Sequence, residues 1–191
     1  NKYSFAALKS DGSVITWGRA DTGGDSSSVS EKLQAGYTLE DHQLDYSANV
    51  NGIKQIFSNE NAFAAITING TVVTWGRSDK GGDSSKVDQV LYGVERIFST
   101  KESFAALTNS GNVFAWGNES SGGNNLSVIS QLESVVSISS TDHAYAALKE
   151  DGSVVTWGLG DFGGDPTSIS SDLNTISVDD VRSDLNNVIK I

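Results

Sequence analysis

The chain contains no cysteine, no methionine and only one proline among its 191 residues. Without cysteine there can be no disulfide, no thiolate metal site and no thiol nucleophile, so these chemistries are excluded. No apolar run approaches the roughly 20 residues that a membrane-spanning helix requires. We therefore expect neither a disulfide scaffold nor insertion into a membrane.

Basic residues are also scarce, with 13 Lys and Arg against 24 Asp and Glu and a formal net charge of -11. Binding to nucleic acid requires a basic face that contacts phosphates, so nucleic acid is not an expected partner. Docking on anionic lipid has the same requirement. The acidic, serine-rich, cysteine-free composition favours an extracellular or cell-surface protein.

What the sequence does have is an internal repeat, seen most clearly in FAAITINGTVVTWGRSDKGGDSSKV at 63–87. The repeat occurs four times, and its tryptophans are Trp17, Trp75, Trp116 and Trp157. The tryptophans are 58, 41 and 41 residues apart, so the unit is 41 residues long and the first spacing is extended. A fixed period of this length indicates a propeller, a solenoid or an array. The predicted repeats are about 1–52, 53–93, 94–134 and 135–191, within a single domain of 1–191.

Each repeat predicts three strands and a short helix. In the second repeat an apolar strand at 53–57 precedes two hairpin strands at 63–66 and 72–75. The Asn69-Gly70 pair between them is typical of a type I′ hairpin turn. The hairpin strands are apolar at both odd and even positions, which is the pattern of strands covered on both faces. The predicted fold is therefore all-β, with small sheets stacked face to face and the four tryptophans packed between them.

A glycine pair followed by Asp or Asn comes after each hairpin, as in Gly81-Gly82-Asp83. Glycine supplies backbone freedom and Asp is a favourable helix N-cap. The apolar pair Val87 and Leu91, four residues apart, then predicts one or two helical turns that pack on the sheet.

Two segments, AALKSDGSVITWG at 6–18 and YAALKEDGSVVTWGLGDFGG at 145–164, resemble the repeat of the RCC1-like β-propellers. The resemblance is closer to the short bacterial repeats of the BLIP-II type, and it covers all four repeats. It implies a small propeller that binds proteins through loops at the blade edges. Gly-Gly-Asp or Gly-Gly-Asn replaces the usual Gly-Gln segment here, and four repeats are fewer than a propeller of this family usually has.

The two ends of the chain together rebuild one more repeat, because 187–191 match 52–56 and 1–5 match 59–63. Two interpretations follow. Either the C-terminal strand completes the N-terminal blade and closes a four-bladed ring, or the chain is a slice of a longer array completed by a neighbouring segment. Closure is favoured because it leaves few open sheet edges.

Two segments break the period, an insertion around 34–50 and a second at 174–186. Insertions in repeat proteins map to loops on one face, which is often the binding face. Aromatic and histidine side chains in the first insertion, together with aromatics unique to one repeat, are the candidate partner-binding residues. They are Tyr37, His42, Tyr46, Tyr92 and Phe162.

Catalysis is not predicted, because the two histidines, His42 and His143, lie on different repeats and no Ser-His-Asp or zinc-ligand arrangement is present. No cofactor is expected. Carboxylates on either side of the glycine pair could provide oxygen ligands for calcium. These candidates are Asp21, Asp25, Asp79, Asp83, Asp161 and Asp165, although helix capping already explains the second Asp of each pair.

The sequence thus predicts a non-enzymatic protein-binding or adhesion module that presents loops on a propeller scaffold. One alternative is a structural building block of a large surface adhesin or filament, formed by self-assembly with blades completed between neighbouring segments. Another is a sugar-binding lectin, which would expose aromatic side chains at equivalent positions on several blades.

Overall fold

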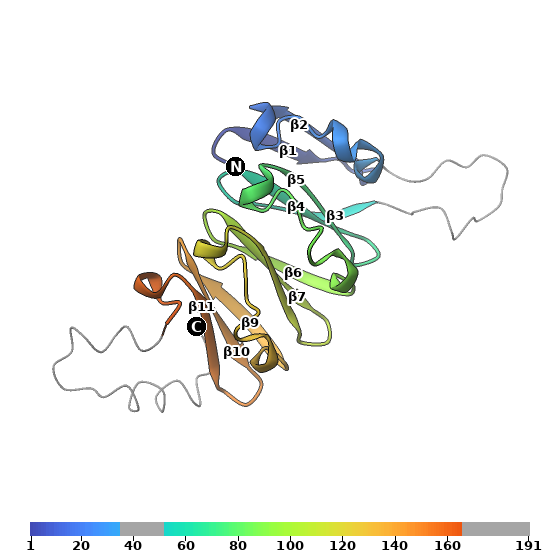
Figure 1. Ribbon diagram of the computed structural model, residues 1–191. Coiled ribbons are helices and arrows are strands. Elements are labelled where there is room, and N and C mark those ends of the chain that lie inside the picture. Colours follow the sequence, from blue (N-terminus) through green and yellow to red (C-terminus); the bar gives the residue numbers. More distant parts are fainter. Residues whose placement is uncertain (35–51, 166–191) are drawn as a thin grey trace.

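The computed structural model describes residues 1–34 and 52–165. These residues form four antiparallel sheets in a row, one from each repeat (Figure 1). The first sheet contains β1 (Ser4–Leu8) and β2 (Val14–Gly18), and the second contains β3 (Ile53–Ser58), β4 (Ala62–Thr67) and β5 (Val72–Gly76). The third contains β6 (Val94–Ser99), β7 (Ser103–Thr108) and β8 (Val113–Gly117), and the fourth contains β9 (Val135–Ser140), β10 (Ala144–Lys149) and β11 (Val154–Gly158). The three predicted strands are confirmed in the second, third and fourth repeats, and the two hairpin strands are confirmed in the first.

The middle strands of the second and third sheets are covered on both faces, as the apolar pattern predicts. All six residues of β4 and all six of β7 are buried. Ala64, Ala65, Ala105 and Ala106 have no exposed surface, and their small side chains allow the neighbouring sheets to approach closely. The four sheets are therefore the blades of one stack, and apolar residues from adjacent blades share each core cluster.

The hairpin turns differ from the predicted type I′ geometry. In the second blade Ile66 pairs with Val72, and the Thr67 amide donates to the Thr71 carbonyl at 2.9 Å. Gly70 has a φ of 75°, whereas Asn69 is not among the described residues with positive φ. The Gly70 amide donates to the Thr67 carbonyl at 3.0 Å, which closes a type I turn followed by a left-handed glycine. The prediction of two positive φ values was wrong because the loop is one residue longer.

The short helix predicted after the glycine pair is present in the first three repeats as a 3-10 helix, and another 3-10 turn precedes the pair in all four repeats. These 3-10 segments are η1 (Ala20–Thr22), η2 (Ser27–Leu33), η3 (Ser78–Lys80), η4 (Asp88–Val90), η5 (Glu119–Ser121), η6 (Ile129–Gln131) and η7 (Gly160–Phe162). Gly81 ends η3 in the left-handed conformation, and Asp83 accepts the Ser85 amide at 2.9 Å in a local turn. Asp83 is therefore not the N-cap of η4, which begins five residues later. In the described part of the chain, no helix is long and apolar enough to cross a membrane.

Adjacent blades dock through the same contact at each junction. We call the Trp and the aromatic residue opposite it the aromatic face of a blade, and the glycine pair after the preceding hairpin the glycine turn. The indole Nε1 of Trp75 donates to the Gly23 carbonyl at 3.1 Å. Equivalent bonds join Trp116 to Gly81 and Trp157 to Gly122, both at 3.0 Å. Every described junction therefore places an aromatic face on the glycine turn of the repeat before it.

Only a glycine fits this turn. Gly23 has a φ of 98°, and a Cβ added there would lie 2.6 Å from the ring of Phe63. The ring and the left-handed backbone thus exclude a side chain independently. This contact explains the first glycine of the pair at each described junction, and the second glycine is required because a Cβ at Gly24 would lie 2.5 Å from the Gly18 main chain.

The first blade differs from the others because only β1 and β2 are described in it. Its aromatic face is exposed, and the first and fourth blades lie at opposite ends of the row (Figure 1). The closing strand predicted at 187–191 lies outside the described residues, and so does nearly all of the insertion around 34–50. Closure of the ring by that strand stays a prediction.

Candidate functional site

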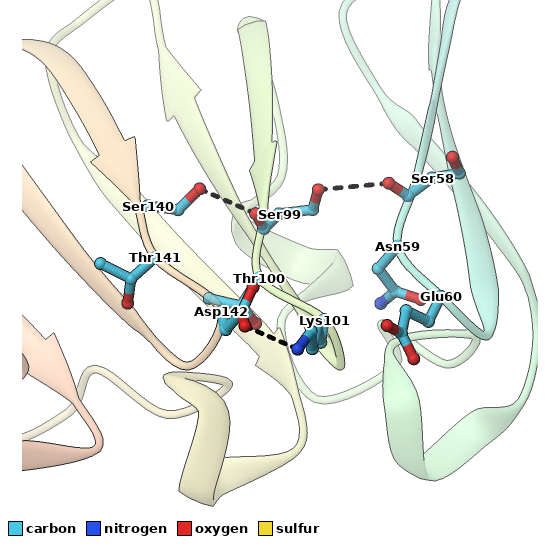
Figure 2. A pocket seen from close by; sticks show the side chains of 9 residues that line it. All are labelled: Ser58, Asn59, Glu60, Ser99, Thr100, Lys101, Ser140, Thr141 and Asp142. Atoms are coloured by element: carbon cyan, nitrogen blue, oxygen red, sulfur yellow. Dashed lines mark hydrogen bonds and ion pairs between the residues drawn. The ribbon is translucent and has the colours of Figure 1, made fainter. Parts of the chain in front are cut away.

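Two concave surfaces lie on the described blades. The first is a polar hollow of about 400 Å³ where β3, β6 and β9 end (Figure 2). Each strand contributes its last serine and the two residues that follow it. The lining residues are Ser58, Asn59, Glu60, Ser99, Thr100, Lys101, Ser140, Thr141 and Asp142.

Hydrogen bonds across the hollow join successive blades. The Ser99 hydroxyl donates to the Ser58 carbonyl at 3.2 Å, and the Ser140 hydroxyl donates to the Ser99 carbonyl at 2.8 Å (Figure 2). The Lys101 amide donates to the Asp142 carbonyl at 2.9 Å. The Lys101 ammonium lies 2.6 Å from an Asp142 carboxylate oxygen. Many of the hydrogen-bonding and charged groups that line the hollow therefore hold adjacent blades together.

Charges of opposite sign alternate along this surface. Lys2, Glu60, Lys101 and Asp142 occupy the equivalent position of the four repeats. Lys2 and Glu60 lie 3.7 Å apart at the first junction, and the Glu60 amide donates to the Lys101 carbonyl at 3.1 Å at the second. Opposite charges thus pair at the first and third junctions, and a main-chain bond brings Glu60 next to Lys101 at the second, which favours one order of blades over another.

A partly buried ion pair lies beside the hollow, between the second and third repeats. Lys80 Nζ is 2.7 Å from Glu102 Oε2, which also accepts the Asn118 side-chain amide at 2.6 Å. Burial alone raises the pKa of Glu102, but the hydrogen bond and charge of Lys80, with smaller contributions from Asn118 and His143, lower it below its ordinary value of 4.5. Glu102 therefore contributes stability while it is ionised.

We expect Glu102→Gln to lower the free energy of unfolding by about 1 kcal/mol at pH 7, a modest effect typical of a partly exposed pair. Because the folded-state pKa is depressed, this contribution is present above pH 4.5 and is lost as the pH falls through the folded-state pKa. Urea denaturation of both proteins from pH 7 to pH 3 measures the difference. A difference that grows on acidification would contradict this assignment, and Glu95→Gln, on the exposed side of β6, is the matched control.

The second surface is a larger groove of about 920 Å³ between the second and third repeats. Val90, Leu126 and Ile129 contribute exposed apolar side chains, and Leu126 is 70% exposed. Phe114 and the buried Trp116 belong to the blade beneath them. Charged residues, mostly acidic, also line the groove. They are Asp79, Asp83, Lys86 and Glu119.

The predicted partner-binding residues do not come together in the described structure. Tyr92 is 63% exposed and follows η4, outside the lining of the groove. Phe162 lies in η7 on the fourth repeat, where its ring contacts His143 edge-on with 4.6 Å between centroids. Tyr37, His42 and Tyr46 lie outside the described residues.

The tryptophans occupy two different environments. Trp75, Trp116 and Trp157 are buried between blades, whereas Trp17 is 49% exposed. The sequence around Trp17 gives no sign of this difference, because it matches the other repeats.

Asp21, Asp25, Asp79 and Asp83, four of the six calcium candidates, bind other groups of the chain. Arg19 contacts both carboxylate oxygens of Asp21 at 2.6 and 2.8 Å, and Arg77 contacts Asp79 at 2.9 Å. Asp25 and Asp83 accept backbone amides, and Asp161 and Asp165 lie on the exposed turn of the fourth repeat. Over residues 1–34 and 52–165, no group of three or more His, Asp or Glu side chains is placed to hold a metal ion.

The apolar residues of the groove were missed by sequence reasoning. Val90 and Ile129 lie next to apolar positions that were assigned to packing on the blade. Leu126 stands between Asn125 and Ser127, where no periodicity marks it. The signal that could have found Leu126 is its departure from the repeat, since the second repeat has Ser85 at the equivalent position.

No family model and no curated protein sequence matches the chain. Solved structures do match it. The structure of human WBSCR16 matches with a TM-score of 0.51 and 15% identity, over 82% of this chain and 45% of that one. The structure of Prp20p from Saccharomyces cerevisiae, described with its binding to Gsp1p and histones, matches with a TM-score of 0.51 and 22% identity, over 83% of this chain and 43% of that one.

The chain thus spans less than half the length of either structure. Prp20 is also described as the yeast RCC1. At these identities the likeness concerns the fold, and it agrees with the repeat, the blades and the docking of each blade on the next. The chain has the fold of a small β-propeller built from four RCC1-like repeats, as its sequence predicts.

Proposed function

We propose that this chain is a non-enzymatic protein-binding module whose partner docks in the groove between the second and third repeats. The observation that carries the proposal is the combination of exposed Leu126, Val90 and Ile129 with a polar rim. An apolar patch surrounded by polar residues is typical of protein-binding surfaces. The description of Prp20p with Gsp1p and histones supports protein binding on this scaffold.

The charges indicate which segment the groove would accept. Asp83 and Glu119 line it with Asp79, Lys86 is the single basic residue among its lining residues, and the chain carries a net charge of -11. An apolar segment flanked by Lys or Arg would bury its apolar side chains on Leu126 and place its charges near the acidic rim. The partner in this proposal is a polypeptide of that composition.

Protein binding is proposed ahead of glycan binding because of where the aromatic residues lie. A lectin of this architecture would expose aromatics at equivalent positions on several blades. In the described blades the equivalents of Phe5, which are Phe63, Phe104 and Tyr145, are buried. The proposal also includes a bacterial, extracellular or cell-surface setting with an adhesive role, supported by the BLIP-II-type repeat and the acidic, cysteine-free composition.

A random peptide library displayed on phage tests the proposal. Peptides selected on the full chain should be enriched in apolar residues flanked by Lys or Arg, and fluorescence anisotropy then measures their affinity. Leu126→Glu should weaken binding about tenfold or more, since a hot-spot residue near the centre of an interface costs about 2 kcal/mol or more and tenfold corresponds to about 1.4 kcal/mol. Leu126 is exposed, so the variant should keep the melting temperature of the unmodified chain.

Val136→Glu is the matched control, because Val136 is an exposed apolar residue on β9, outside the lining of the groove. It should bind the selected peptides as the unmodified chain does. Equal affinities for Leu126→Glu and the unmodified chain would place the binding surface elsewhere and contradict the proposal.

A further inference from the structure

The two ends of the row of blades carry opposite halves of the contact that joins the blades. On the first blade the rings of Phe5 and Trp17 are stacked with 5.3 Å between centroids, like the pair Phe63 and Trp75 at 5.2 Å. Phe5 is 62% exposed and Trp17 is 49% exposed, whereas Trp75 is 2% exposed. The first blade therefore presents a complete aromatic face, and no glycine turn within residues 1–34 and 52–165 covers it as at the other junctions.

The fourth repeat presents the complementary half. Gly163 has a φ of 94°, close to the 98° of Gly23 and the 101° of Gly81. A Cβ added at Gly23 or at Gly81 would lie 2.6 Å from a phenylalanine ring of the next blade. A Cβ added at Gly163 would meet no described atom within 4 Å. The last glycine turn thus has the shape of the others, and no aromatic face from the described part of the chain lies on it.

The charges at the two ends are complementary as well. Along the polar hollow the sequence of charges is Lys2, Glu60, Lys101 and Asp142, from the first blade to the fourth. The described row begins with a base and ends with an acid. A fourth blade followed by another first blade would bring Asp142 to Lys2, with the same alternation as the pair of Lys101 and Asp142.

We propose that two copies of this chain join head to tail, with the aromatic face of one copy on the Gly163-Gly164 turn of the other. Trp17 Nε1 donates to the Gly163 carbonyl of the second copy, as Trp75 donates to Gly23 within one chain. Asp142 pairs with Lys2 across the same junction. This proposal is independent of the peptide groove, since it involves the two outer blades.

The two solved structures of this fold favour a closed pair over an open filament. A head-to-tail contact forms a ring if its rotation closes and a fibre if it does not. One copy spans 45% and 43% of the two solved structures of this fold, so two copies supply nearly one full propeller. Two sets of four blades also stay within the range of about 4 to 8 blades found in propellers.

Light scattering after gel filtration of the unmodified chain tests the proposal. We expect a mass of about twice the 20.1 kDa of one copy. Trp17→Glu should return the mass to that of one copy, because a carboxylate would be buried at the junction. Val136→Glu should leave the pair intact. An unmodified chain that remains a single copy at concentrations of about 100 μM, typical of weak association, would overturn the proposal.

A variant at the Gly163-Gly164 turn tests whether the two copies join head to tail. Asn tolerates the left-handed conformation better than most residues, so Gly163→Asn should fold and yet block the glycine turn. Gly122→Asn is the internal comparison, because its Cβ would lie 2.7 Å from Tyr145 in the same chain and should lower the melting temperature.

If the copies join head to tail, the Trp17→Glu protein and the Gly163→Asn protein should each remain a single copy in solution. When the two variants are mixed, they should form a mixed pair. The mixed pair retains one intact junction, between the free glycine turn of the first variant and the free aromatic face of the second. If Gly163→Asn still forms pairs alone and the mixture forms no mixed pair, the two aromatic faces meet each other and the proposed direction is wrong.

Discussion

Replacing Trp75 with alanine is expected to lower the free energy of unfolding by about 3–5 kcal/mol, the usual cost of truncating a buried large aromatic residue. The Trp75 side chain is buried between the first and second blades, where its ring stacks on Phe63. The substitution also removes the hydrogen bond from Nε1 to the Gly23 carbonyl and leaves that acceptor without its indole donor. Urea denaturation followed by circular dichroism measures the loss.

Trp17→Ala is the matched control, because Trp17 occupies the equivalent position with an exposed side chain. In solutions dilute enough to contain single copies, its cost should be about 1 kcal/mol or less. Equal costs for the two substitutions would mean that both tryptophans have the same environment. That result would contradict burial of the aromatic faces at the internal junctions.

Gly82→Ala is the second substitution with a large expected effect. A Cβ at Gly82 would lie 2.4 Å from the Gly76 carbonyl oxygen and 2.5 Å from its carbon, and both are main-chain atoms that cannot rotate away. The loop after β5 would have to shift, and Gly81 next to it would move off the Phe104 ring. We expect a loss of about 3 kcal/mol, at the upper end of the usual cost of overpacking.

Gly52→Ala provides the control for this substitution. Its added Cβ would lie 3.5 Å from the nearest described atom, Ile68 Cγ2, which is an ordinary contact. Its φ is not among the positive values, so Ala is compatible with the backbone there. The free energy of unfolding should change by about 1 kcal/mol or less. Thermal unfolding of both variants compares them, and a Gly82→Ala protein as stable as Gly52→Ala would show that the glycine turn is not tightly packed.

The blades could be predicted from the sequence because each strand carries its own pattern. Apolar residues recur at the positions of Ile53 and Ile56 in the second, third and fourth repeats, and at the positions of Val72 and Trp75 in all four. Asn-Gly, Asp-Gly or Ser-Gly pairs mark the hairpins. The turn type could not be predicted, because an Asn-Gly pair occurs in both two-residue and three-residue hairpin loops. The pairing of Ile66 with Val72 in the structure shows that the loop has three residues. The spacing of Val87 and Leu91 correctly indicated a helical turn packed on the blade, but it could not show that the turn is the short 3-10 helix η4.

The candidate sites depended on features that the sequence does not display. Trp17 has the same local sequence as Trp75, and only the absence of a described blade beside it makes its environment different. The groove is formed by residues from two repeats, so its lining depends on how the third blade docks on the second. The charge alternation from Lys2 to Asp142 could have been read from the sequence, since the four residues occupy one repeat position.

The four indole N–H groups test most directly whether aromatic faces dock on glycine turns. The chain has four tryptophans, so a ¹⁵N-labelled sample should give four indole resonances whose hydrogen exchange can be followed separately. We predict slow exchange for Trp75, Trp116 and Trp157, and fast exchange for Trp17 in dilute solution that slows as concentration rises. Four indoles that exchange equally fast, or a Trp17 that is equally protected at every concentration, would contradict this arrangement.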